Sequence, residues 1–287
     1  MKKYLQLFIV IVALASINLN AGSLRIEPKI LAKNLSQYKI LDTRSLDLYN
    51  QGHIQGALSF PISLTYEHIK QNGKLTNPVK MQKLLRSLGL KTDSKIVIYD
   101  NGDFFDASRL FWSLEVYGFT QVKLLNTGYD NWDLSSYPTD TITPLVQESN
   151  YIAKINNKRL ATKFSTQIAT KNPNQIIIDA RPEKAYKGLK SSAKRFGHIP
   201  KAQNFPASHN VNYEDQGQTL QTISRLKEIY KNVDKNKKIV IYCAVGRISS
   251  VNYFALRELD YDVANYDASW KEWGNDTSLP IVNPSKE

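Results

Sequence analysis

Short apolar runs alternate along the chain with segments in which apolar residues recur at helical spacing. The continuous runs at 95–100, 175–180 and 238–243 are typical of strands buried on both faces of a parallel sheet. Residues 249–261 instead place apolar side chains at Val251, Phe254, Ala255 and Leu259, as one face of a helix does. Alternating strands and helices predict an α/β fold with parallel sheets flanked by helices.

The chain also contains one domain twice. Residues 40–61 recur as 177–206, and both copies read as an apolar strand, Asp-x-Arg, a tyrosine, a Gly-His-Ile turn and a closing Phe-Pro. Residues 95–100 recur as 238–243, and 122–132 as 263–273, at a nearly constant separation. This pattern indicates duplication of a whole domain. We predict an N-terminal domain over 24–140, an interdomain linker over 141–172 and a C-terminal domain over 173–287.

The first residues have the pattern of a secretory signal. Lys2 and Lys3 precede an uncharged apolar stretch over 5–17, which small and polar residues follow. This stretch is shorter than the roughly 20 apolar residues that span a bilayer, so an uncleaved anchor is the weaker alternative. We therefore expect a signal peptide over 1–21, export to the periplasm in a two-membraned bacterium, and no stable membrane insertion after cleavage.

Composition narrows the classes of partner. With 38 Lys and Arg against 26 Asp and Glu, the formal charge is +12, which is compatible with nucleic acid, anionic membranes or small anions. The basic residues form no dense block, so we expect a solvated basic surface and no nucleic-acid partner. Four scattered histidines and one cysteine predict no metal site, and no cofactor motif is present. The sequence does not specify an oligomeric state.

Cys243 is the single cysteine, so it has no partner for an intramolecular disulfide. A lone cysteine is either an inert buried thiol or a reactive one. Cys243 ends a predicted strand and stands just before a predicted helix, whose free N–H groups and dipole favour negative charge. Gly246 allows an unusual backbone conformation and Arg247 adds a positive charge, and together these features favour the nucleophilic thiolate. We predict that Cys243 is catalytic.

The first domain carries Asp100 where the second carries Cys243. A carboxylate cannot carry sulfur and would repel an anionic substrate, so we expect this domain to be catalytically silent. A role of Asp100 as a general base across the domain interface is the less favoured alternative.

With these motifs the chain resembles the tandem-domain rhodaneses, which are the thiosulfate and 3-mercaptopyruvate sulfurtransferases. The resemblance rests on the paired Asp-x-Arg and Gly-His-Ile motifs, the Tyr-Asp loop of the first domain, the loop over 242–251 and the closing stretch over 266–281. It implies a five-stranded parallel sheet with flanking helices in each domain. It also implies that Cys243 carries sulfur as a persulfide from a small anionic donor to cyanide or a thiol.

The same resemblance implies substrate-binding residues. The N–H groups of the loop after the cysteine would hold the transferred sulfur, and this loop comprises Ala244, Val245, Gly246, Arg247, Ile248 and Ser249. Arg181 matches the arginine that binds the substrate anion, with bracing of its own loop as the alternative, and Arg44 would be its structural counterpart. The residues directly after Cys243 match neither donor type of the family, which leaves 3-mercaptopyruvate open. Thiosulfate is favoured because a basic exported protein would meet that small anion outside the cytoplasm.

Two other functions remain as alternatives. A phosphatase-like cysteine enzyme would need a larger anion loop, with its arginine further from the cysteine than Arg247 stands. A non-catalytic persulfide carrier needs the same activated thiol, so the sequence does not separate it from an enzyme.

Overall fold

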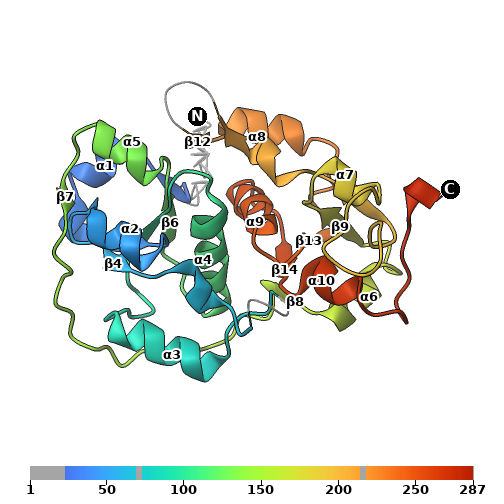
Figure 1. Ribbon diagram of the computed structural model, residues 1–287, viewed down its shortest axis with the longest axis horizontal. Helices are drawn as coiled ribbons and strands as arrows, with labels where there is room; N and C mark the ends of the chain where they lie inside the picture. The colour runs from blue at the N-terminus through green and yellow to red at the C-terminus, as the bar shows by residue number, and fades with distance from the viewer. Residues whose placement is uncertain (1–22, 69–72, 214–217, 287) are drawn as a thin grey trace, which may run out of the picture.

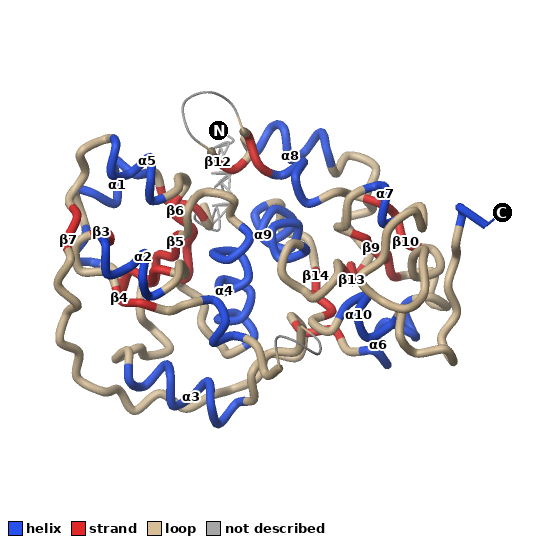
Figure 2. Tube along the Cα trace, in the orientation of Figure 1, coloured by secondary structure: helices blue, strands red, loops and turns tan. Residues whose placement is uncertain are grey.

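The structure is a computed structural model, and it describes residues 23–68, 73–213 and 218–286. Figure 1 shows two lobes side by side, and Figure 2 shows that the strands lie inside each lobe with helices around them. The predicted signal over 1–21 lies outside the described residues.

The first lobe is built on a five-stranded parallel sheet of order β1-β6-β5-β2-β4. Its strands are β1 (Arg25–Ile26), β2 (Lys39–Asp42), β4 (Leu58–Ser59), β5 (Ile96–Tyr99) and β6 (Val122–Leu125). Its helices are α1 (Pro28–Ala32), α2 (Leu46–Gln51), α3 (Pro78–Ser87), α4 (Phe105–Val116) and α5 (Tyr129–Leu134). Strands β3 (His53–Ile54) and β7 (Thr139–Asp140) form a small antiparallel pair.

The second lobe repeats this arrangement, with a parallel sheet of order β10-β9-β13-β14-β8. Its strands are β8 (Leu160–Ala161), β9 (Gln175–Asp179), β10 (Ala202–Asn204), β13 (Lys238–Tyr242) and β14 (Val263–Tyr266). Its helices are α6 (Lys163–Ala169), α7 (Glu183–Tyr186), α8 (Ile223–Ile229), α9 (Ser249–Glu258) and α10 (Ser269–Trp273). Strands β11 (Val211–Asn212) and β12 (Thr219–Leu220) pair antiparallel. The predicted α/β fold and its duplication are confirmed.

The central strands fold as predicted because their residues are apolar on both faces. All four residues of β5 and of β14 are buried, as are four of the five residues of β13. A strand covered on both faces by helices needs such a continuous run.

The boundary of the second domain differs from the prediction. Strand β8 pairs with β14, and α6 follows it directly, so part of the predicted linker over 141–172 belongs to the second sheet. Strand β8 contains only Leu160 and Ala161, and a strand of this length is too short to show an apolar pattern in the sequence. The connecting chain before them is itself anchored, since Tyr151 is buried and its hydroxyl donates to the carbonyl oxygen of Tyr117 at 2.6 Å.

The two lobes share one hydrophobic core along α4 and α9, which lie next to each other at the junction in Figure 1. Phe111 of α4 meets Phe254 of α9 edge to face, with ring centroids 5.0 Å apart. Polar contacts close the same interface, since Glu115 accepts hydrogen bonds from Tyr253 at 2.5 Å and from Arg257 at 2.9 Å. The first lobe is therefore positioned to contribute to any site at the start of α9.

Three short helical turns and the chain end complete the described elements. The turns η1 (Leu35–Gln37), η2 (Ile62–Thr65) and η3 (Ala207–Asn210) lie beside the sheets, and η4 (Pro284–Lys286) lies near the C-terminus. Within the described residues, none of the helices is both long and apolar enough to cross a bilayer.

Candidate active site

Cys243 lies where the prediction placed it, between the carboxyl end of β13 and the start of α9. Its side chain is only 1% exposed and packs in a small apolar cluster. The neighbours in this cluster come from both lobes: Ala180, Ala207, Ile248 and Phe105. Among the described residues, the hydrogen bond to the sulfur comes from the hydroxyl of Ser249, which lies 3.4 Å from the Sγ atom. The thiol therefore has a nearly closed, largely apolar environment.

The loop after Cys243 turns its carbonyl groups outward. The oxygens of Cys243 and Ala244 accept hydrogen bonds from the N–H groups of Trp270 and Lys271, each at 3.0 Å. The oxygen of Gly246 accepts from Ser250 Oγ at 3.0 Å. By contrast, none of the N–H groups of residues 244–248 has an acceptor within the described part of the chain. A ring of free N–H groups of this kind is an anion-binding concavity.

Gly246 is required by the backbone of this loop. Its φ is +69°, in the left-handed region, and a Cβ atom there would lie 2.5 Å from the carbonyl oxygen of Asp267. Any other residue at this position would adopt an unfavourable backbone conformation, and its Cβ atom would fit only if the loop shifted.

The corresponding loop of the first domain is closed by its own side chain. The carboxylate of Asp100 accepts hydrogen bonds from the N–H groups of Gly102 at 2.8 Å, Ala107 at 3.0 Å and Phe104 at 3.3 Å. Burial, and next the charge of Asp103, raise the pKa of Asp100 to about 7. Both oxygens of Asp100 are engaged by this loop, which agrees with a silent domain and gives no support to a general base acting across the interface.

Arg247 forms ion pairs across the domain interface, and its predicted role in substrate binding stays a prediction. Its guanidinium group pairs with Asp106 at 2.5 Å and with Asp103 at 3.5 Å, both in the first domain. It also lines a cavity of about 400 Å³ together with Arg44 and Asp100. The positive charge is drawn to two carboxylates that lie far from it in the sequence.

Arg181 is buried and braces the chain that follows β9. It pairs with Asp179 at 2.6 Å and donates to the carbonyl oxygen of Gly197 at 2.7 Å. Arg44 repeats these contacts with Asp42 and Gly52 in the first domain, both at 2.6 Å. Both arginines therefore brace their own loops, which is the alternative role predicted for Arg181.

Arg181 has one further property. Its Nη1 atom is buried and has no hydrogen-bond partner among the described residues, and its guanidinium carbon lies 4.5 Å from the ring centroid of Trp270. This free donor is consistent with the substrate-binding role, which stays a prediction.

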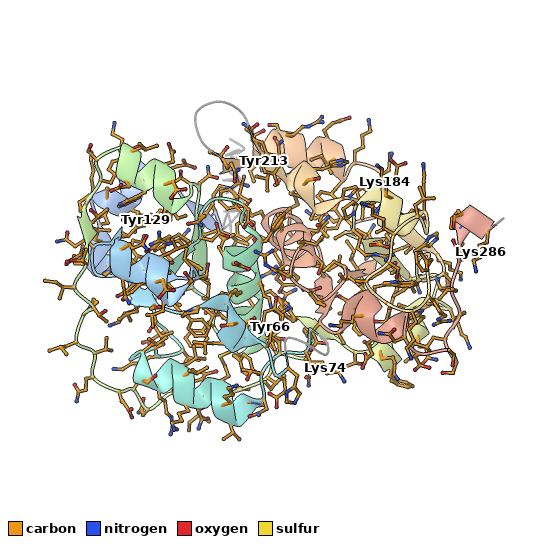
Figure 3. All side chains as sticks on the ribbon, viewed as in Figure 1. Tyr66, Lys74, Tyr129, Lys184, Tyr213 and Lys286 are labelled. Carbon is orange, nitrogen blue, oxygen red and sulfur yellow. The ribbon has the colours of Figure 1, made fainter. Side chains whose placement is uncertain are left out.

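Residues of the first domain that were not predicted from the sequence reach the loop after Cys243. Arg109 of α4 donates to the loop carbonyls, and Tyr66 lies under the guanidinium of Arg109 at 3.7 Å from the ring centroid. Figure 3 labels Tyr66 on the side of the first lobe that faces the second. Gly73 approaches so closely that a Cβ atom would lie 1.9 Å from the carbonyl oxygen of Val245. One sequence feature could have indicated this contact: a charged residue, Arg109, lies within the largely apolar stretch of α4.

Ser269 is a further missed residue. Its hydroxyl accepts a hydrogen bond from the N–H of Cys243 at 3.1 Å and donates one to the carbonyl oxygen of Tyr266 at 2.7 Å. Its φ of +53° marks a strained turn at the start of α10.

Two copies of one domain match a known family. The rhodanese-like domain matches residues 27–135 and 160–276. The chain belongs to the rhodanese-like family. The second match begins at β8, in agreement with the structural boundary rather than with the predicted one at 173.

Named relatives cover most of this rhodanese-like chain. A protein of Haloferax volcanii provisionally named thiosulfate sulfurtransferase is 32% identical over 82% of this chain and 85% of its own. The 3-mercaptopyruvate sulfurtransferase of Escherichia coli strain K12 is 30% identical over 81% of this chain and 84% of its own. The solved structure of the Escherichia coli 3-mercaptopyruvate enzyme SseA superposes with a TM-score of 0.77 at 27% identity, covering 86% of this chain and 99% of that one. This rhodanese-like protein is a sulfurtransferase.

The described residues contain no group of three or more His, Cys, Asp or Glu side chains that could hold a metal ion.

Proposed function

We propose that this sulfurtransferase takes a sulfane sulfur from thiosulfate, carries it as a persulfide on Cys243, and passes it to cyanide or a thiol. The observation that carries the proposal is the contrast between two loops. In the first domain the N–H groups bind the carboxylate of Asp100, whereas after Cys243 they have no acceptor among the described residues. A loop of this kind is ready to receive negative charge on a sulfur atom.

The proposed reaction has two steps. The Cys243 thiolate attacks the outer sulfur of thiosulfate, so that a new S–S bond forms and sulfite leaves with the electron pair of the old one. The negative charge then rests on the outer sulfur of the Cys243 persulfide, where the loop N–H groups stabilise it. Cyanide attacks that sulfur through carbon, thiocyanate forms, and the electron pair returns to Cys243 as the thiolate.

The choice of thiosulfate rests on size and on charge. The apolar walls around Cys243 leave its side chain 1% exposed, which favours a compact donor over the longer 3-mercaptopyruvate. The free Nη1 of Arg181 offers a donor for an anion near the same strand ends. Relatives named for each donor are about equally similar to this chain, so the donor is decided by experiment.

The test is the intact mass of the purified protein after incubation with thiosulfate, compared with Cys243→Ser. We expect a gain of one sulfur atom on the wild type alone, which cyanide removes as thiocyanate. No gain on a demonstrably free thiol would exclude thiosulfate, and the same assay with 3-mercaptopyruvate would then identify the other donor.

Steady-state turnover separates an enzyme from a carrier. A relative in Thermus thermophilus, 29% identical over 82% of this chain, is named a sulfur carrier protein. Continuous thiocyanate formation from thiosulfate and cyanide supports the enzyme, whereas a single stoichiometric transfer would support the carrier.

We further propose that residues 1–21 are a secretory signal and that the mature protein works in the periplasm. Support comes from Lys2 and Lys3 before the apolar stretch over 5–17. The mass of the protein recovered from a periplasmic fraction tests this, because cleavage after Ala21 shortens the chain by a defined amount. Full-length protein in the cytoplasmic fraction would contradict it.

A further inference from the structure

Arg109 belongs to α4 of the silent domain, yet its donors reach the loop of the catalytic domain. The side chain is fully buried. Its Nη1 atom donates to the carbonyl oxygens of Gly246 at 2.9 Å and Val245 at 3.3 Å. The remaining donors hold it in place, because Nη2 donates to the oxygen of Gly73 at 2.8 Å and Nε to Thr65 Oγ1 at 2.9 Å.

The charge of Arg109 acts on peptide groups rather than on a carboxylate. No salt bridge within the described residues includes Arg109, although its guanidinium stacks on Tyr66 and lies 5.4 Å from the ring centroid of Trp112. A buried charge without an ion-pair partner is costly to the fold. Such a residue is expected where the charge serves another purpose.

The orientation of the loop N–H groups follows from the planarity of the peptide bond. In a trans peptide the C=O and N–H bonds point in opposite directions. The oxygen of Val245 shares its peptide group with the N–H of Gly246, and the oxygen of Gly246 shares its own with the N–H of Arg247. By binding these oxygens, Arg109 turns the N–H groups of residues 246 and 247 to the opposite side.

The backbone of α10 does the same for the two preceding peptide groups. Trp270 and Lys271 bind the oxygens of Cys243 and Ala244, which orients the N–H groups of residues 244 and 245. The catalytic domain thus orients two N–H groups through its own backbone, and the silent domain orients the next two through Arg109.

We infer that Arg109 is a positioning residue for sulfur transfer, which aims the N–H groups of Gly246 and Arg247 at the sulfur on Cys243. The inference rests on the proposed persulfide function. In the silent domain, loop N–H groups converge on the carboxylate of Asp100, which marks the same place relative to its strand. The silent domain is therefore part of the catalytic apparatus.

The test compares Arg109→Gln and Arg109→Lys with a matched control, Arg25→Gln. Arg25 also belongs to the first domain and donates across the interface, to the oxygen of Gln221 at 2.9 Å and to the carboxylate of Glu258, but away from the loop. The readouts are the rate of persulfide formation at saturating thiosulfate, the KM, and the pH midpoint of Cys243 alkylation by iodoacetamide.

We expect Arg109→Gln to slow persulfide formation on the order of 10- to 100-fold, because misplaced donors no longer stabilise the charge that develops on sulfur. The KM should change by less than about threefold, since binding of the ground state is little affected. The alkylation midpoint should move to higher pH, and Arg109→Lys should recover part of each effect. Arg25→Gln should lower thermal stability and leave the rate per folded molecule and the midpoint unchanged.

Equal rates and midpoints in Arg109→Gln and Arg25→Gln would overturn the inference. If Arg109→Gln does not fold, Thr65→Val removes the Nε acceptor together with the hydrogen bond from Thr65 Oγ1 to the oxygen of Ile62. It should give a smaller change in the same direction, and an unchanged Thr65→Val would count against the inference. A wild type that forms no persulfide while the Arg109 variants still shift the alkylation midpoint would refute the proposed function and leave the positioning role standing.

Discussion

Asp100 and Cys243 occupy the same position in two copies of one loop, and the side chain at this position decides what the loop binds. The carboxylate of Asp100 accepts hydrogen bonds from two N–H groups of its own loop and one of the first turn of α4, at 2.8 to 3.3 Å. The Cys243 side chain is too short to do so, and the N–H groups around it stay available. The first loop is thus closed by its own side chain, whereas the loop after Cys243 keeps N–H groups that can hold a transferred atom.

Asp100 makes the stability of the protein depend on pH. Burial raises its pKa to about 7 from an ordinary value of 3.8, so between these values the folded chain holds a proton that the unfolded chain has released. The free energy of unfolding should therefore fall as pH rises through this window, by up to about 1.4 kcal/mol per pH unit, and level off above it. Urea denaturation of the wild type and Asp100→Asn at pH 5, 6, 7 and 8 measures this. The variant should give a flatter profile, and parallel profiles would contradict the assignment.

Gly246→Ala should impair the site more than the fold. A left-handed conformation costs a residue with a Cβ atom about 1–2 kcal/mol, and here that atom would also lie 2.5 Å from the oxygen of Asp267. We expect a loss of thiosulfate turnover on the order of 10-fold or more, as for other displaced catalytic loops. Gly56→Ala is the control, because Gly56 also has a positive φ of 78° but has nothing within 4 Å of the added atom. Equal turnover in the two variants would contradict a specific requirement for glycine at position 246.

The ion pair of Arg247 with Asp106 predicts a modest effect on donor binding. Since the guanidinium is neutralised by a carboxylate at 2.5 Å, Arg247→Gln should change kcat/KM for thiosulfate by less than about threefold. A double-mutant cycle with Asp106→Asn should show coupling between the two residues in stability. A tenfold or larger rise in KM would instead support the sequence-based prediction that Arg247 binds the donor.

Glu115 should contribute far more to stability than an exposed carboxylate. It accepts hydrogen bonds from Tyr253 and Arg257 across the shared core, so Glu115→Ala leaves a mostly buried charge unpaired. The expected loss is about 3 kcal/mol in the free energy of unfolding. Glu228→Ala, which removes an exposed pair with Lys231, should lose far less. Similar losses in denaturant titrations of the two variants would count against a specific role of the interface.

Local pattern was sufficient to predict what lies along the chain. Continuous apolar runs identified β5, β9 and β13. The internal repeat identified the two domains and showed that Asp100 and Cys243 occupy equivalent positions in them. These features depend on neighbours in sequence or on comparison of the two copies, so the sequence contains the information needed.

Contacts between the domains could not be predicted in this way. Arg247 carries no local sign that Asp106 lies opposite it, and Arg109 gives no indication that its acceptors are carbonyl oxygens 136 and 137 residues away. The boundary at 173 was wrong for a related reason, since β8 is defined by pairing with β14 rather than by its own composition.

The edge-to-face contact of Phe111 with Phe254 has a consequence for the history of the chain. After duplication, the copy without a thiol became a folding partner, because its helix covers apolar residues that a separated second half would expose to water. The first domain therefore gives the second both an apolar cover, through α4, and a side chain that reaches its loop, through Arg109.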